Sequence, residues 1–163
     1  MTQHRVLIID DDQMMRNSLV DLAEAAGWTV KALSRATDAA RWINQFHPDV
    51  ILSDLRMPDM SGMDLLLNLK RGPPLVLISA HGDIPVAVDA MSAGAYSFVE
   101  KPYDPKRLLL ILTHAAEQHQ MRQSNLRLKD RLQELSGLDR MIVGQAAVSL
   151  LLRLTIFSLS ECQ

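Results

Sequence analysis

The chain has 163 residues, of which 48% are hydrophobic and 22% charged, and its formal net charge is -2. This length allows one compact domain and a remainder, and the composition excludes a disordered tail. Because there is no basic excess to hold a phosphate backbone, we do not expect this chain to bind nucleic acid by itself.

Short apolar runs alternate with amphipathic stretches along the first 120 residues. The runs predict five buried strands, at residues 6–9, 28–33, 50–53, 75–78 and 96–100. The stretches between them predict helices at residues 13–26, 37–45, 63–70 and 84–93, and a last helix begins near Pro105. Gly27 and Gly94 are placed to end two of these helices. The alternation predicts a doubly wound α/β domain, with a parallel sheet covered on both faces.

The last predicted helix is longer than such a domain needs. Leu108, Leu112 and Ala115 can pack on the domain, and no helix-ending residue follows before Gly137. A heptad pattern begins at residue 118, with Gln118, Asn125 and Leu132 at position a and Met121, Leu128 and Leu135 at position d. Leucine at d with asparagine at a is typical of a short parallel dimer. A solvated helix is the alternative, since two of the three a residues are polar, and we favour the dimer.

Polar side chains follow four of the predicted strands: Asp10, Asp11 and Asp12 the first, Asp54 the third, Ser79 the fourth and Lys101 the fifth. The carboxyl ends of parallel strands form the functional crevice of an open α/β sheet, so we expect these side chains to meet. Clustered carboxylates repel one another unless a cation compensates, and Mg²⁺ suits hard oxygen ligands. A carboxylate beside Mg²⁺, a lysine and a hydroxyl can accept a phosphoryl group. A single acidic residue here could simply cap a helix, but capping does not explain all four positions.

These residues lie in motifs that resemble the receiver domain of bacterial two-component response regulators, over residues 4–120. The motifs are VLIIDDD at residues 6–12, SDLRMPDMSG at 53–62, ISA at 78–80 and KP at 101–102. Residues 81–88 and 94–98 look closest to the sigma-54-dependent activators of the nitrogen-regulator and dicarboxylate-transport-regulator types. The resemblance implies a flavodoxin-like sheet of strand order 2-1-3-4-5, a receiver domain at residues 1–120 and an extended C-terminal helix.

The resemblance also implies roles at the site. Asp54 takes the phosphoryl group from a phosphohistidine of a sensor histidine kinase, and Lys101 offsets charge on the phosphoryl oxygens. Asp11, Asp54 and the backbone carbonyl of Arg56 hold Mg²⁺, with Asp10 acting directly or through water. A receiver of this kind is a phosphoacceptor with at most slow self-dephosphorylation, and so we do not expect an enzyme.

Further positions match the family. Ser79 and Phe98 stand where receivers carry their switch hydroxyl and switch aromatic, so phosphorylation is expected to draw Ser79 inward and let Phe98 follow. Arg16 aligns best when the acidic pair is Asp10 and Asp11, which leaves Asp12 as a helix cap. The peptide before Pro102 is implied to be cis.

The end of the sequence resembles the entry to the AAA+ ATPase domain of the same activators. We interpret residues 121–137 as a helical, coiled-coil linker and residues 138–163 as the stub of that domain. No phosphate-binding G-x-x-x-x-G-K-[ST] loop and no helix-turn-helix motif occurs in the sequence. We therefore expect the chain to be the regulatory end of a longer protein. A membrane span over residues 141–160 is the alternative, but Arg153 makes it costly.

Two other functions are consistent with parts of the sequence. Asp10 and Asp12 have the D-x-D spacing of an aspartate-nucleophile phosphatase of the haloacid-dehalogenase type, but Met14 stands where such enzymes prefer threonine or valine. A stand-alone receiver that acts only by protein contact is the second alternative.

Cys162 has no second cysteine to pair with, and the first apolar run is too short for a signal peptide, so we expect a cytoplasmic protein with no membrane contact.

Overall fold

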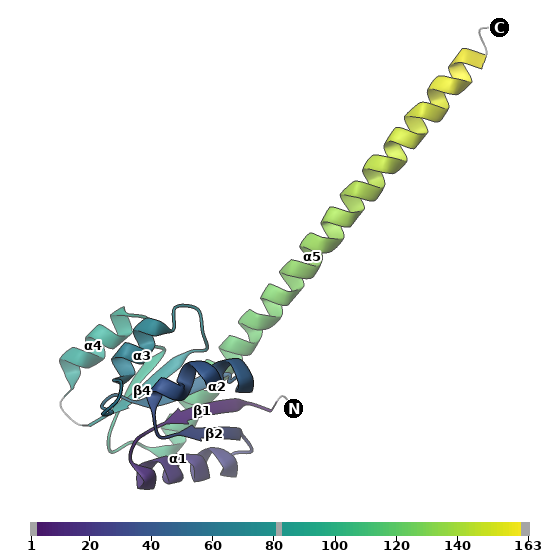
Figure 1. The fold of residues 1–163 in the computed structure, drawn as a ribbon. Helices are drawn as coiled ribbons and strands as arrows, with labels where there is room; N and C mark the ends of the chain where they lie inside the picture. Colours follow the sequence, from purple (N-terminus) through teal and green to yellow (C-terminus); the bar gives the residue numbers. More distant parts are fainter. Residues whose placement is uncertain (1–2, 81–82, 161–163) are drawn as a thin grey trace. The chain divides into compact units, whose positions relative to one another are not determined.

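The computed structural model describes residues 3–80 and 83–160, with side chains described as far as residue 137. Within these residues, strands and α-helices alternate along the chain (Figure 1). The strands are β1 (Arg5–Ile9), β2 (Thr29–Leu33), β3 (Val50–Asp54), β4 (Leu75–Ser79) and β5 (Ser97–Glu100). The helices are α1 (Gln13–Ala25), α2 (Ala39–Phe46), α3 (Gly62–Asn68), α4 (Ile84–Ser92) and α5 (Pro105–Ser160), and a 3-10 turn, Ala36–Asp38, precedes α2. Every predicted element is present, although several ends differ by one or two residues.

The strands form one parallel sheet in the order β2-β1-β3-β4-β5, which confirms the predicted flavodoxin-like topology. Ile8 of β1, for example, pairs with Ala32 of β2 on one side and with Leu52 of β3 on the other. Because all pairings are parallel, the carboxyl ends of the strands meet at one edge of the sheet. This edge carries the predicted site residues.

The sheet is buried on both faces, which explains why β1 is an unbroken apolar run. Val6 and Ile8 belong to a core layer that includes Leu108 and Leu112 of α5. Leu7 and Ile9 point to the opposite layer, where residues of α2, α3 and α4 cover the sheet. Fully burying one such side chain contributes roughly 1.5–3 kcal/mol. The predicted packing of the first turns of α5 on the domain is confirmed.

Residues with positive φ follow three of the helices. Gly27 comes after the C-cap of α1 with φ 85°, and Gly94 comes after the C-cap of α4 with φ 106°. Both glycines end helices as predicted, because this backbone region carries no steric cost for glycine. His47 ends α2 in the same left-handed region, with φ 52°, which its residue type did not indicate.

Helix α5 extends beyond the domain. The chain divides into two compact units, Met1–Met121 and Arg122–Gln163. Within the first unit, the Gln120 side-chain amide donates to Oδ2 of Asp49 at 3.2 Å, and the same oxygen accepts the backbone N–H of Arg5 at 2.8 Å. This contact ties the last turn of α5 in the first unit to the start of β1.

Gly137 does not interrupt α5, which continues to Ser160. The sequence placed a first break at Gly137, but a single glycine inside a helix costs only about 1 kcal/mol, which the flanking helix formers offset. The region considered as a membrane span, residues 141–160, and Cys162 lie outside the described side chains. In the part of the chain that the structure describes, no helix is both long and apolar enough to cross a membrane.

Candidate functional site

Three aspartates converge at the carboxyl edge of the sheet. Asp10 follows β1, Asp11 is the next residue, and Asp54 ends β3. One carboxylate oxygen of each lies within 4.8 Å of the others. Two oxygens bound to one Mg²⁺ lie about 3–4 Å apart, because each sits about 2.1 Å from the ion, so this donor set fits Mg²⁺ with little adjustment. Asp10 is buried, Asp54 half-buried and Asp11 exposed, which leaves one side of the cluster open to solvent.

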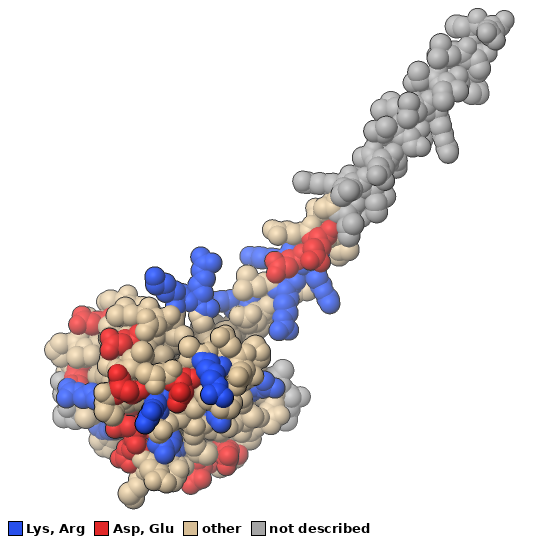
Figure 2. Space-filling model, in the orientation of Figure 1, with Lys and Arg blue, Asp and Glu red and all other residues tan. Residues whose placement is uncertain are grey.

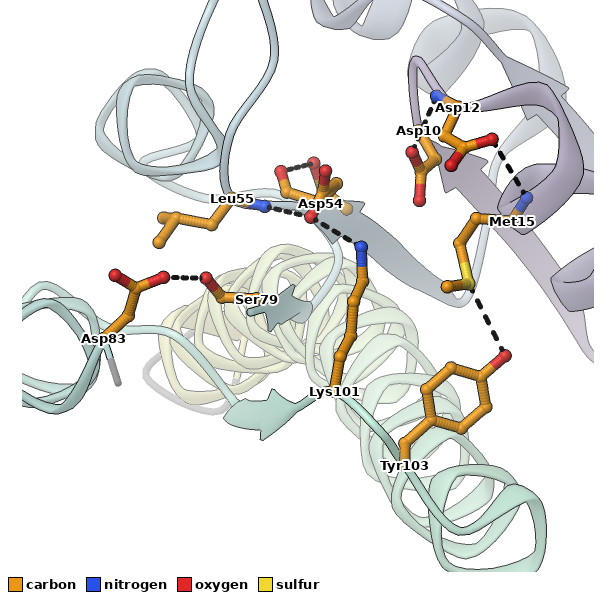
Figure 3. Close-up of polar contacts among 10 residues, drawn as sticks. Asp10, Asp12, Met15, Asp54, Leu55, Ser79, Asp83, Lys101 and Tyr103 are labelled. Carbon is orange, nitrogen blue, oxygen red and sulfur yellow. Dashed lines mark hydrogen bonds and ion pairs between the residues drawn. The ribbon is translucent and has the colours of Figure 1, made fainter. Parts of the chain in front are cut away.

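Lys101 supplies a positive charge beside Asp54. It follows β5 and reaches past β4, so that its Nζ lies 3.3 Å from Oδ1 of Asp54 (Figure 3). The same oxygen accepts the backbone N–H of Leu55 at 3.1 Å. The peptide between Lys101 and Pro102 is cis, as the resemblance implied. Asp54 therefore has a positive charge and a backbone donor on one oxygen.

Burial disfavours the ionised forms of Asp10 and Asp54. Burial raises the pKa of Asp10 to about 6, and the charges of Asp54 and Asp11 add to the shift, against the opposing effects of the Asp12 N–H and Lys101. Burial also raises the pKa of Asp54, with Asp11 adding to it, although Lys101 and the Leu55 N–H oppose the shift. Lys101 thus does not fully compensate the charges of Asp10 and Asp54, and a bound cation would.

Asp12 is turned away from the cluster and caps α1. Its Oδ1 accepts the backbone N–H of Met14 at 2.9 Å and that of Met15 at 3.4 Å, which confirms the predicted cap. Arg16 donates from Nη1 to the backbone carbonyl of Asp10 at 2.7 Å, fixing the turn between β1 and α1. The phosphatase alternative needs Asp12 as a second free carboxylate, and this carboxylate is used by the helix.

Ser79 and Arg56 both contact Asp83, a residue that the sequence did not single out. The buried hydroxyl of Ser79 donates to Oδ2 of Asp83 (Figure 3). Nη2 of Arg56 donates to Oδ1 of the same carboxylate at 2.6 Å. The hydrogen bond from Ser79, together with Arg56, lowers the pKa of Asp83. Asp83 directly precedes α4 and comes four residues after Ser79, a spacing that could have drawn attention to it. His81 lies outside the described residues.

Phe98, the predicted switch aromatic, lies on β5 beside Leu77 of β4. It is half-buried and packs against the core layer that covers β4. It also lines a surface groove between α4 and β5, together with Ile84, Val88 and Met91. The switch position is therefore continuous with an apolar surface of the domain.

The loop after β3 is shaped by Gly62. A Cβ at this position would lie 2.6 Å from the carbonyl oxygen of Asp54 and 2.6 Å from Cδ2 of Leu77, so only glycine fits here without a shift. The backbone N–H of Gly62 donates to the carbonyl of Leu55 at 2.8 Å and closes the loop that carries Arg56. The loop motif thus holds Arg56 close to the phosphoacceptor candidate.

Known proteins are similar to this chain in sequence and in fold. A family model described as the response regulator receiver domain matches residues 6–113. The chain is 37% identical over 164 residues to the C4-dicarboxylate transport transcriptional regulatory protein DctD of Pseudomonas aeruginosa, covering 99% of this chain and 36% of the relative. It is 34% identical over 157 residues to the transcriptional regulatory protein FixJ of Rhizobium meliloti, covering 92% of this chain and 77% of the relative.

A solved structure of NtrX from Brucella abortus superposes with a TM-score of 0.70 at 30% identity, covering 78% of this chain and 30% of the other. The chain spans about a third of the length of the DctD relatives. The expected likeness to dicarboxylate-transport and nitrogen regulators is confirmed by these relatives and by a match to NtrC of Proteus hauseri. Family model, relatives and sheet topology agree, and the chain belongs to the response regulator receiver family.

Proposed function

We propose that Asp54 accepts a phosphoryl group from the phosphohistidine of a sensor histidine kinase. The observation that carries this proposal is the convergence of Asp10, Asp11 and Asp54 beside Lys101 at the carboxyl edge of the sheet. An oxygen of the Asp54 carboxylate attacks the phosphorus atom, the phosphorus–nitrogen bond breaks, and the imidazole leaves. Receivers are regulators, so the chain is a phosphoacceptor and not an enzyme in its own right.

Mg²⁺ would be held by Asp10, Asp11 and Asp54 with the backbone carbonyl of Arg56. Bound there, it would neutralise charge on the phosphoryl oxygens. Lys101, whose Nζ lies 3.3 Å from Oδ1 of Asp54, would offset part of the same charge. The raised pKa values of Asp10 and Asp54 support this role, because carboxylates crowded in a partly buried site favour a cation.

Phosphorylation would be read through Ser79 and Phe98. A phosphoryl group at Asp54 adds about -1.5 to -2 of charge and strong hydrogen-bond acceptors, which attract the Ser79 hydroxyl. Movement of Ser79 makes room for Phe98, whose ring lines the groove between α4 and β5. The signal then changes the surface formed by α4, β5 and α5.

The phosphorylation signal would control the binding of a second copy of the chain, which pairs through the heptad residues of α5. Met121 in the first unit is exposed, and so are Leu128, Leu132 and Leu135 in the second. Charged side chains of both signs accompany them along the described part of the second unit (Figure 2). An exposed apolar seam with charged flanks is the pattern of a coiled coil, and it favours a dimer over a stand-alone receiver.

In the whole protein, the receiver would control an attached sigma-54-activator ATPase and thereby transcription in the cytoplasm. This proposal follows from the names of the relatives, which are transcriptional regulatory proteins about three times the length of the chain in the case of DctD. The chain itself would contact the kinase and its own copy, not nucleic acid.

Phosphorylation of the full chain by a small phosphodonor tests the assignment of Asp54. We expect intact-mass spectrometry after incubation with acetyl phosphate and Mg²⁺ to show one added phosphoryl group, which EDTA prevents. Asp54→Asn is expected to abolish the addition. Asp12→Asn is the matched control, because asparagine caps a helix as well as aspartate does and the site is left intact. A phosphoryl group mapped to Asp10, or retained by Asp54→Asn, would contradict the proposal.

A further inference from the structure

The Ser79 hydroxyl already has an acceptor in the structure. It is buried, and its donor is used by Oδ2 of Asp83. A hydroxyl has a single hydrogen, so while it is donated to Asp83 it is not available to an acceptor at Asp54. The role proposed for Ser79 therefore begins with the loss of this hydrogen bond.

Asp83 is committed to this contact. Its position at the N-cap of α4 would normally have its side chain accept a backbone N–H of the first turn, yet it makes no such cap bond. One carboxylate oxygen accepts from Ser79 and the other is paired with Arg56 at 2.6 Å. Only 10% of the Asp83 side chain is exposed, whereas 74% of the Arg56 side chain is exposed. The carboxylate is thus buried between the two partners.

Arg56 links this contact to the phosphoacceptor. It lies two residues after Asp54, in the loop closed by the hydrogen bond between Gly62 and Leu55. Its guanidinium pairs with an ionised carboxylate, and a hydrogen bond to a charged acceptor is stronger than one between neutral groups. Arg56, in the loop that follows Asp54, therefore fixes the Asp83 carboxylate, which in turn accepts the hydrogen bond from Ser79.

We propose that Asp83, supported by Arg56, is a positioning residue that keeps the Ser79 hydroxyl away from Asp54 until a phosphoryl group competes for it. This inference rests on the proposed function of Asp54. Breaking the hydrogen bond between Ser79 and Asp83 is part of the free energy cost of the phosphorylated state. Loss of the Asp83 carboxylate removes this cost, and the buried hydroxyl, left without its acceptor, is then free for the phosphoryl oxygens.

The test compares the binding of beryllofluoride, a phosphoryl mimic, to the full chain in Mg²⁺ by isothermal titration calorimetry. We expect Asp83→Ala to lower the apparent dissociation constant on the order of tenfold, the value of one hydrogen bond to a charged group. Asp83→Asn keeps the shape and weakens the acceptor, so we expect a smaller decrease, and it serves if the alanine variant folds poorly. Asp89→Ala is the matched control, because it removes an exposed acidic charge from the same helix.

The Ser79→Ala background separates positioning from a general effect on the loop. Without the hydroxyl, Asp83→Ala should leave the dissociation constant unchanged, whereas in a Ser79→Thr background, which keeps a hydroxyl, the decrease should persist. The inference is overturned if Asp83→Ala fails to tighten binding, or if it tightens binding equally in the Ser79→Ala background. Absence of beryllofluoride binding to the unsubstituted chain would instead overturn the proposed function, and this inference with it.

Discussion

At the scale of single residues, the site gathers acidic side chains at a place where burial opposes their ionisation. Asp10 and Asp54 are held in a partly buried position where their ionised forms are disfavoured, and Lys101 offsets only part of the charge. The fold thus maintains an arrangement that is unfavourable when empty and favourable when a cation is bound. The raised pKa of Asp10 therefore predicts that the stability of the metal-free chain depends on pH.

In EDTA, the metal-free chain is expected to lose stability as the pH rises. The folded pKa of Asp10 is about 6 and its ordinary value is 3.8, so the folded state holds the proton more tightly than the unfolded state does. The resulting stabilisation is complete below about pH 3.8 and is lost as the pH rises through about 6, a change of roughly 3 kcal/mol. Urea unfolding at a series of pH values measures it. Asp10→Asn should flatten the profile between pH 4 and pH 7 (roughly the window of the shift), and an unchanged slope in this variant would refute the assignment.

At the scale of elements, the loop between β3 and α3 must bring Arg56 and Leu55 to the site without displacing β4. Gly62 allows this, since the loop backbone passes where a side chain would collide with Asp54 and Leu77. Ser61 then caps α3 by accepting the N–H of Asp64, while the Asp64 carboxylate accepts the N–H of Ser61. The close approach and the cap together determine where the loop ends.

Gly62→Ala is expected to destabilise the domain by about 1–3 kcal/mol, the usual cost of overpacking a filled interior. The added methyl group would sit 2.6 Å from the Asp54 carbonyl oxygen, which is backbone and has little freedom to move. Gly72→Ala is the control, because its nearest neighbour, Cδ2 of Leu69, lies at an ordinary 3.5 Å. Thermal unfolding of the two variants measures the difference. Equal melting temperatures would show that the loop adjusts more easily than the contacts indicate.

At the scale of the whole molecule, the receiver and the second unit meet within one continuous helix. Residues of α5 as far as Ala116 belong to the core of the domain, whereas all described residues from Met121 onward are exposed. The apolar side chains of the second unit have no cover within the described chain, and their heptad spacing matches self-association. In the proposed function, changes on the α5 surface of the domain would act on the dimer contact through the helix that joins the two units.

Leu128→Ser is expected to abolish dimerisation, because it places a polar group at a d position of the seam. Leu126→Ser is the matched control: Leu126 is exposed to a similar degree, 50% against 57% for Leu128, but it lies off the heptad seam. Sedimentation of both variants, with and without beryllofluoride and Mg²⁺, measures the mass. Equal loss of the dimer in the two variants would exclude the predicted register, and identical masses with and without beryllofluoride would exclude a phosphorylation-dependent dimer.

Prediction from the sequence worked best where periodicity or backbone chemistry decides the outcome. The buried strands follow from unbroken apolar runs, and Gly27 and Gly94 mark helix ends because their φ values suit glycine. The meeting of Asp10 and Asp54 follows from parallel topology alone. The contact between Ser79 and Asp83 was missed, since a side-chain rotamer in a loop leaves no periodic signal. Gly137 predicts a helix end that the structure does not have, because the sequence does not show how far the neighbouring residues offset the cost of one glycine.

The hydrogen bond between Gln120 and Asp49 shows at which edge of the sheet α5 leaves the domain. Asp49 and Arg5 lie at the amino ends of their strands, the edge of the sheet opposite to Asp54. A strand of five residues spans about 16 Å, so the exit of α5 and the phosphoacceptor are at least that far apart along the sheet. In the proposed function, phosphoryl transfer at Asp54 and pairing of two chains through α5 would therefore take place at opposite edges of the sheet.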